Sequence, residues 1–400
     1  MRKVNIYGVF ARLANLFIGV RKNHWVFGAD YGLTYREGSK YLLEYMLSHH
    51  PDFDCTFITK SVEVYNFLKD KGIPCEMNFS RKGIICIARA EKVFVTQALT
   101  DINYSFKKCG RKFYFLVHGQ PLKNDLCQLP EDKRIEMMGK KRRSKIQKLK
   151  EDFCRWLTVG YKFSDIDFVS SCSDFLAHYQ RMEFPPSVAV KILGMPRNDA
   201  LFQPERMKQE KWVEGLQDKF VVTYMPTHRK YGAGTLPLTP FANRPDVQQW
   251  FENNQVAFVV KMHPTMIPYI KEGDIANYKG MVDITKLKID PQVCIYHSDV
   301  LITDFSSVWM DYLLLRRPTL FYIYDDFEHE DAGTMYDLRE DPPGHFCSTE
   351  DELFELIKRA KTNYDSMRPS ERIIKKYHKF IDGNSCQRYF DALTAENDEK

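Results

Sequence analysis

The clearest candidate for acid–base chemistry follows a predicted β-strand. Residues 113–117 form an apolar run that leads into His118, Gly119 and Gln120, with Lys123 just beyond. Ligands of open parallel sheets bind beyond the carboxyl ends of the strands, so an imidazole there is placed for catalysis, and a glycine lets a ligand approach the backbone. His118 taken alone fits a structural histidine as well as a catalytic one.

Two further predicted strands, 220–224 and 256–260, end in groups suited to phosphate oxygens. These groups are a hydroxyl, two imidazoles, a guanidinium and an ammonium, from Thr227, His228, Arg229, Lys261 and His263. Charged donors of this kind bind phosphate strongly. The alternative for the first group is a surface turn. Histidines at strand ends in both halves of the chain favour one cleft over two unrelated cores.

The sharpest local signal is a strand that runs into a helix. Residues 300–303 end in Thr303 and continue through Asp304 to Ser306 and Ser307, after which an apolar helical pattern begins. A serine there is the natural N-cap, and the free N–H groups of the first turn form an anion site. Capping alone explains the serines equally well, and one set of atoms can serve both purposes.

Several common phosphate and metal signatures are missing from the sequence. There is no Gly-x-x-x-x-Gly-Lys-Ser/Thr loop and no Gly-x-Gly-x-x-Gly fingerprint, which argues against P-loop and dinucleotide enzymes. No Asp-x-Asp pair stands at a strand end, so neither a metal nor another cofactor is indicated. Charge on a diphosphate leaving group is then offset by Arg, Lys, hydroxyls and a helix N-terminus.

A basic segment between residues 140 and 150 holds seven cations and no acid: Lys140, Lys141, Arg142, Arg143, Lys145, Lys148 and Lys150. Apolar residues around it recur at helical spacing, which predicts an amphipathic helix on anionic lipid or one that holds an anionic polymer. A solvated helix face is the plain alternative. No nucleic-acid module accompanies the charge, so a nucleic-acid partner is not expected.

The elements that must position these groups alternate between strand and helix along the whole chain. The strands predicted in the first half are 24–27, 55–59, 92–96, 112–117 and 168–170, and those in the second half are 188–193, 220–224, 256–261, 300–303 and 319–324. Helices are predicted at 39–47, 351–361 and 387–393. The fold class is therefore α/β, with two Rossmann-like doubly wound domains.

Prolines and a turn-like stretch at 194–199 place the break between the halves near residue 200. We predict an acceptor-side domain over 1–200 and a nucleotide-donor domain over 201–375. The last residues, 376–400, are expected to form a helix that packs back on the first domain.

Composition supports a folded protein of the cell interior. The chain is 44% hydrophobic with a net charge of +5, which excludes a disordered chain. Its ten cysteines form no Cys-x-x-Cys pair, so we interpret them as reduced thiols of a cytoplasmic protein. Polar residues interrupt the apolar stretch 4–20, and no apolar run reaches the ~18 residues of a spanning helix. If the protein contacts a membrane, we expect it to bind at the membrane surface.

Taken in order, the motifs resemble the CDP-glycerol glycerophosphotransferase family, which makes teichoic acids and capsule polymers. They are HGQPLK (118–123), GMPRND (194–199), PTHR (226–229), HP (263–264), TDFSS (303–307) with Asp311, and DG (382–383) with Arg388. The resemblance spans about residues 24 to 390. Val117, Gln120 and His228 depart from the Trp, Thr and Trp usual in that family, which bears on the polyol and acceptor more than on the reaction.

The resemblance implies a GT-B architecture, with nucleotide held mainly by the second domain and acceptor by the first. It also implies peripheral association with the inner face of the cell membrane, where lipid-linked acceptors reside, and it makes His118 and His263 the essential histidines. Gly119, Gln120 and Lys123 would face the acceptor.

Our hypothesis is that an acceptor hydroxyl attacks the β-phosphorus of CDP-glycerol or CDP-ribitol and expels CMP. His118 serves as general base, because an imidazole with a pKa near ~6.5 suits that task. The donor is held by a set of phosphate-binding residues: Arg197, Thr227, Arg229, Lys261, His263, Thr303, Asp304, Ser306 and Ser307. A GT-B glycosyltransferase that uses a nucleotide sugar and a non-catalytic binder of anionic polymer are the competing hypotheses.

Overall fold

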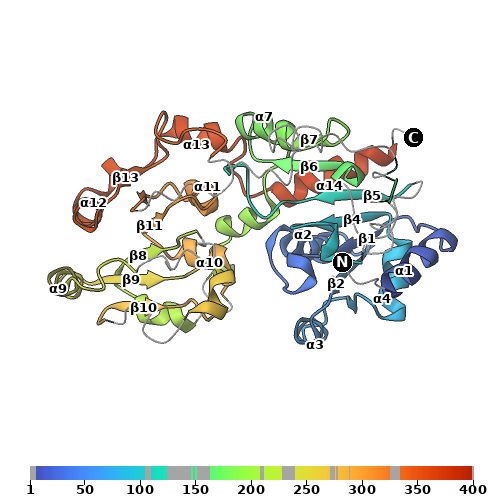
Figure 1. Cartoon of the computed structure of the whole chain (residues 1–400), viewed down its shortest axis with the longest axis horizontal. Helices are drawn as coiled ribbons and strands as arrows, with labels where there is room; N and C mark the ends of the chain where they lie inside the picture. The colour runs from blue at the N-terminus through green and yellow to red at the C-terminus, as the bar shows by residue number, and fades with distance from the viewer. Residues whose placement is uncertain are drawn as a thin grey trace. The chain divides into compact units, whose positions relative to one another are not determined.

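The computed structural model contains two compact units, each built on one parallel β-sheet (Figure 1). The residues it describes are 6–103, 110–123, 146, 149–150, 163–207, 211–227, 239–270, 275, 278–287, 289–324 and 334–398. The first unit comprises Met1–Gln120, Asp125–Asp199 and Asn384–Lys400. The second comprises Pro121–Asn124 and Ala200–Gly383.

The first unit has a seven-stranded sheet in the order β3-β2-β1-β4-β5-β6-β7. Its strands are β1 (His24–Phe27), β2 (Asp54–Thr59), β3 (Cys75–Met77), β4 (Lys92–Val95), β5 (Lys112–Phe115), β6 (Phe168–Ser171) and β7 (Ala189–Ile192). All pairings are parallel, and the central strands are buried along their length, as expected for a sheet covered on both faces. Trp25, Phe27 and Phe94 lie in its core.

Helices precede, connect and follow the strands of this sheet. The first unit contains α1 (Ile6–Phe17), α2 (Glu37–His49), α3 (Val62–Asp70), α4 (Arg81–Arg89), α7 (Asp174–Glu183) and α14 (Ser385–Asp398). Ser61, Ser80 and Ser173 cap three of them by accepting a hydrogen bond from a main-chain N–H of the first turn.

The second unit repeats the plan with the strand order β10-β9-β8-β11-β12-β13. Its strands are β8 (Phe220–Tyr224), β9 (Val256–Val260), β10 (Met281–Asp283), β11 (Val300–Thr303), β12 (Thr319–Tyr322) and β13 (His345–Cys347). Its helices are α8 (Pro204–Met207), α9 (Pro245–Asn253), α10 (Pro291–Tyr296), α11 (Val308–Leu313), α12 (Glu350–Thr362) and α13 (Glu371–Tyr377). The two sheets bear out the predicted fold class.

The predicted strand 188–193 was grouped with the second half, although the predicted boundary near residue 200 places it in the first. The run 188–193 forms β7, which pairs with β6 at the edge of the first sheet, Phe168 opposite Ala189. The prolines at 185 and 186 end α7 and turn the chain into β7, so they do not mark a domain break. Three strands escaped prediction, β3, β10 and β13, because each is a three-residue edge strand without a long apolar run.

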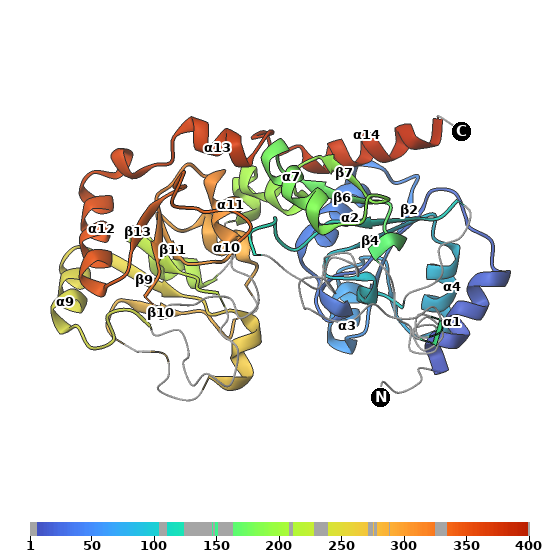
Figure 2. The same ribbon diagram turned by 45° about the horizontal axis from the view of Figure 1, so that its top comes forward.

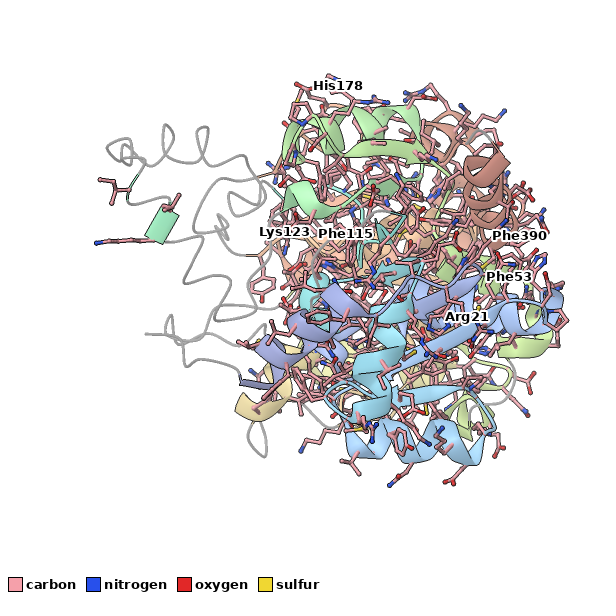
Figure 3. The ribbon with its side chains drawn as sticks, turned by 90° about the vertical axis from the view of Figure 1, so that its right-hand side faces the viewer. Arg21, Phe53, Phe115, Lys123, His178 and Phe390 are labelled. Carbon is pink, nitrogen blue, oxygen red and sulfur yellow. The ribbon has the colours of Figure 1, made fainter. Side chains whose placement is uncertain are left out.

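The last helix, α14, packs on the first unit beside α2 (Figure 2). The buried carboxylate of Asp199 accepts hydrogen bonds from the main-chain N–H groups of Ser385 and Cys386, at 2.8 and 2.7 Å. Phe390 lies against Phe53 with ring centroids 5.6 Å apart (Figure 3). The segment before it, up to Gly383, belongs to the second unit, whereas we had predicted residues 376–400 as one terminal piece.

Two further observations concern membrane spans and thiols. Among the described helices, none combines the length and the apolar character needed to cross a bilayer. The seven cysteines within the described ranges are all free thiols.

Candidate active site

Each sheet has a point where the strand order reverses, between β1 and β4 in the first unit and between β8 and β11 in the second. In doubly wound sheets such a switch point opens a crevice at the carboxyl ends of the strands. The predicted site residues at strand ends can therefore be sorted by unit and by strand.

His118 follows β5 of the first unit, in a constrained loop. The preceding residue, Val117, has a φ of 50°, in the left-handed region that β-branched residues rarely adopt. The His118 ring is exposed, yet surrounding protein lowers its pKa below the ordinary value, chiefly through desolvation and also through the charge of Arg197.

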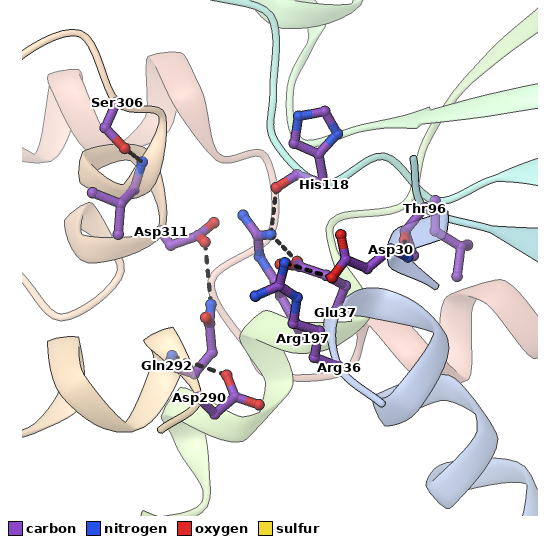
Figure 4. A network of polar contacts seen from close by, with 12 residues as sticks. Asp30, Arg36, Glu37, Thr96, His118, Arg197, Asp290, Gln292, Ser306 and Asp311 are labelled. Carbon is purple, nitrogen blue, oxygen red and sulfur yellow. Dashed lines mark hydrogen bonds and ion pairs between the residues drawn. The ribbon is translucent and has the colours of Figure 1, made fainter. Parts of the chain in front are cut away.

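Arg197 supports the His118 loop. Its buried guanidinium forms an ion pair with Glu37, the first residue of α2, and donates to the main-chain oxygen of His118 at 2.5 Å (Figure 4). Sequence reasoning gave Arg197 a donor-binding role at a hinge. Among the described residues, the guanidinium contacts Glu37 and the main-chain oxygen of His118, both in the first unit, and the donor-binding role stays a prediction.

Gln120, predicted to face an acceptor, is buried at the end of the same loop. Its side-chain oxygen accepts from the main-chain N–H of Cys172 at 3.2 Å, which ties the loop to the end of β6. Gly119 is partly buried beside it. Gln120 therefore has a structural role in the first unit, whatever it does toward a ligand.

The prediction that Lys123 lies in the first domain is wrong, because residues 121–123 pack in the second unit. Lys123 forms an antiparallel bridge with Thr334, and the Leu122 carbonyl accepts from the N–H of Met335 at 2.8 Å. The hydroxyl of Tyr336 adds a bond to the Pro121 carbonyl at 2.9 Å. The main chain thus changes units directly after Gln120.

In the second unit the polar groups at the ends of β8 and β11 contact one another. The N–H of Thr227 donates to a carboxylate oxygen of Asp304 at 2.8 Å, and the hydroxyl of Thr303 donates to the Met225 carbonyl at 2.7 Å. All three polar residues are buried. They lie at the switch point of this sheet, where a ligand crevice is expected.

Lys261 directly follows β9, the strand next to β8, and only 7% of the residue is exposed. Within the part of the chain that the structure describes, its ammonium has neither a hydrogen bond nor an ion pair. A lysine that follows a strand end of a parallel sheet, in a largely buried position, suits a site that binds an anion. His263 follows two residues later and is exposed.

Ser306 and Ser307 precede α11 as predicted, but the capping is weaker than the sequence indicates. Ser307 occupies the N-cap position without a side-chain capping bond, and the hydroxyl of Ser306 is 3.5 Å from the N–H of Val308. The helix has only six residues, so its dipole is small.

Two parts of the prediction lie outside the described residues. They are Arg229, with its neighbour His228, and the basic residues Lys140, Lys141, Arg142, Arg143, Lys145 and Lys148. His118 and His263 belong to different units, so their convergence on one diphosphate stays a prediction.

Sequence reasoning missed two polar residues, Gln292 and Glu37, that contact residues singled out in the sequence. Gln292, in α10, donates to a carboxylate oxygen of Asp311 at 3.1 Å, and Asp290 caps that helix. The Asp290-Pro291 pair is a helix-start signal that could have located α10. Glu37 could have been found by extending the strand-end argument to β1 and along the chain to the start of α2.

Comparison with known proteins supplies the family. The model of the family described as CDP-Glycerol:Poly(glycerophosphate) glycerophosphotransferase matches residues 10–395. The teichoic acid glycerol-phosphate transferase of Staphylococcus aureus (strain NCTC 8325 / PS 47) is 25% identical over 405 residues, covering 96% of this chain and 95% of the relative. The teichoic acid poly(glycerol phosphate) polymerase of Bacillus subtilis (strain 168) is 25% identical over 86% of this chain, which spans only 44% of that polymerase.

A solved structure of the wall teichoic acid polymerase TagF has the same fold. The match has a TM-score of 0.69 at 21% identity and covers 98% of this chain and 94% of the other. With the family model matching nearly the whole length, and with two parallel-sheet units that carry its motifs at their strand ends, the chain belongs to the CDP-glycerol:poly(glycerophosphate) glycerophosphotransferase family.

Proposed function

We propose that this chain transfers glycerol phosphate or ribitol phosphate from a CDP-activated donor to a hydroxyl of a growing teichoic-acid-like or capsular polymer. The family supports this reaction, and the curated relatives named above are glycerol-phosphate transferases or polymerases. The observation that carries the proposal is the position of Lys261, a largely buried residue directly after β9 and beside the switch point of the second unit.

In the proposed reaction the acceptor oxygen forms a bond to the β-phosphorus while the bond from that phosphorus to the bridging oxygen breaks. His118 takes the hydroxyl proton, and the bridging oxygen leaves with CMP. Lys261, Thr227 and His263 bind the diphosphate and stabilise the charge that develops on CMP, because preorganised cations and donors are effective in a site shielded from water. The proposal needs no metal.

The test is nucleotide release by the purified full chain with a polymer or lipid-linked acceptor. CDP-glycerol and CDP-ribitol are offered in separate reactions, and UDP-linked sugars in parallel. We expect CMP release from a CDP-polyol, equal with and without EDTA, and loss of at least 100-fold in His118→Ala and in His263→Ala. His178→Ala, which changes an exposed histidine of α7, is the matched control. Release of UDP alone would refute the proposal.

We further propose that the chain meets anionic lipid through α1. The outer face of this helix exposes Phe10 at 61%, Leu16 at 62% and Phe17 at 86%, while Asn15 on the other face is buried. No acidic residue occurs before Asp30, and this stretch of the sequence carries five basic residues, Arg12 within the helix and Arg2, Lys3, Arg21 and Lys22 outside it. An exposed apolar helix face in a stretch of sequence that carries cations and no acid is typical of helices that lie in the interface of an anionic membrane.

Sedimentation with vesicles tests this proposal. We expect the full chain to bind vesicles that contain phosphatidylglycerol, and Phe10→Glu with Phe17→Glu to weaken that binding by about tenfold or more, because each change removes apolar contact and adds a like charge. Val62→Glu, on an equally exposed site of α3, is the control. Equal binding of the two variants would rule out α1 as the lipid contact.

A further inference from the structure

Glu37 carries a carboxylate that the proposed reaction does not use. It begins α2, and its side chain is only 13% exposed. Its partner is Arg197, whose guanidinium also donates to the main-chain oxygen of His118 at 2.5 Å (Figure 4). One cation therefore connects the start of α2 to the backbone of the candidate base.

The backbone on both sides of this connection is unusual. Glu37 has a φ of 61° and Val117 a φ of 50°, and neither is a glycine. Left-handed conformations of such residues persist only where surrounding contacts hold them, and they are frequent at functional sites. The Arg197 contact joins the two constrained positions, so it determines how the His118 loop is presented.

The charges that act on His118 come from two segments of the first unit, residues 36–37 and Arg197, and they act in addition to desolvation, which lowers its pKa most. Glu37 raises the pKa of His118, whereas Arg197 and Arg36 lower it, and a hydrogen bond to the main chain of Thr96 raises it. Arg36 is itself paired with Asp30 at 2.8 Å. The His118 ring therefore lies among charges of both signs. Removing any one of them should shift the pKa of His118 in a known direction.

We propose that Glu37 and Arg197 form a positioning pair that orients His118 and sets its charge state, and that neither of them binds the donor. This rests on the proposed function, in which His118 is the general base. Glu37 fixes the guanidinium, and the guanidinium fixes the carbonyl of His118, so the imidazole is presented in one orientation.

The experiment measures His118 directly. The full chain is labelled at histidine, the His118 resonance is assigned from its loss in His118→Gln, and it is titrated by NMR. We expect Glu37→Gln to lower the pKa of His118 and Arg197→Gln to raise it. Glu44→Gln, the same change two turns further along α2, is the control and should leave the resonance unmoved.

Kinetics separate positioning from donor binding. We expect Glu37→Gln and Arg197→Gln each to reduce kcat at least tenfold while KM for the CDP-polyol changes by no more than about twofold. Arg197→Lys keeps the positive charge, so the pKa of His118 should stay close to that of the natural chain while turnover is lost. Circular dichroism verifies that each variant is folded, and if Glu37→Gln is not, the two Arg197 variants decide. A raised KM with unchanged kcat, or a His118 titration indifferent to the variants, would overturn the proposal.

Failure of the proposed function and failure of the positioning pair give different results. If His118→Ala keeps full turnover, the assignment of the base is wrong. The opposite titration shifts in the Glu37 and Arg197 variants would still establish that the pair controls the imidazole.

Discussion

The main-chain N–H of Thr227 donates to the carboxylate of Asp304 at 2.8 Å, and this bond joins the ends of β8 and β11 at the switch point of the second unit. A matching bond exists at the other end of the same strand pair, where the N–H of Val221 donates to Asp299 at 2.8 Å. The two bonds hold the same pair of strands, but only the first lies at the carboxyl edge where ligands bind.

Asp304→Ala should therefore lower both stability and activity. It leaves a buried N–H without an acceptor, which costs about 1–3 kcal/mol, and it frees the Thr227 loop. Asp299→Ala should cost a similar amount but keep turnover at a temperature where both variants are folded. Melting temperatures and CMP release of the two variants check this. Equal turnover would show that Asp304 only holds the sheet together.

Lys261→Met should weaken donor binding without harming the fold. A hydrogen bond to a charged group contributes about 1.5–3 kcal/mol, which corresponds to roughly 10- to 150-fold in affinity for CDP-glycerol. Because the structure shows no partner for the Lys261 ammonium among the described residues, we expect its removal to leave the melting temperature nearly unchanged.

Lys286→Met, an exposed lysine of the same unit, is the control. Calorimetric titration with CDP-glycerol and a thermal melt are the measurements. Loss of stability with unchanged affinity would place Lys261 in the scaffold instead.

Much of the second unit's site could be predicted because its groups follow long apolar runs. Lys261, Thr227 and Asp304 each stand where such a run ends, and parallel strands bring these ends to one edge. The first unit was harder. Glu37 lies well beyond the end of β1, and its tie to Arg197 spans 160 residues, a separation for which strand and helix patterns give no signal.

The position of Lys123 was missed for a related reason. The motif 118–123 resembles one strand-end loop, yet main-chain pairing of 122–123 with 334–335 draws its second half into the other unit. Main-chain pairing of this kind leaves no trace in side-chain patterns. Edge strands such as β13 were missed because a run of three residues does not stand out from a loop.

Stability of the second unit should fall as pH drops below about 6.5, partly through His378. Its ring is fully buried at the end of α13 and donates to the Met310 carbonyl of α11 at 2.6 Å, and burial lowers its pKa. A lowered pKa in the folded state means that the unfolded chain binds the proton first, so acid favours unfolding by up to about 1.4 kcal/mol for each pH unit.

His378→Gln keeps a donor for the Met310 carbonyl but does not titrate. Its melting temperature should fall less than that of the natural chain between pH 7 and pH 5. His178→Gln, an exposed histidine, should behave like the natural chain. Parallel curves for all three would mean that His378 does not contribute to the acid sensitivity.

Val117→Gly tests whether the loop before His118 stores strain. Val117 and Val95 are both buried valines of the first unit, so changing either to glycine removes the same apolar side chain and adds the same backbone freedom. Only Val117 has a φ of 50°, a conformation that costs a non-glycine residue about 1–3 kcal/mol and costs glycine almost nothing. Val117→Gly should therefore destabilise the chain by about 1–3 kcal/mol less than Val95→Gly. Because the relaxed loop no longer fixes the imidazole, kcat should nevertheless fall in Val117→Gly. Denaturant melts and CMP release measure both effects, and equal destabilisation at the two sites would mean that the loop stores no strain for His118 to use.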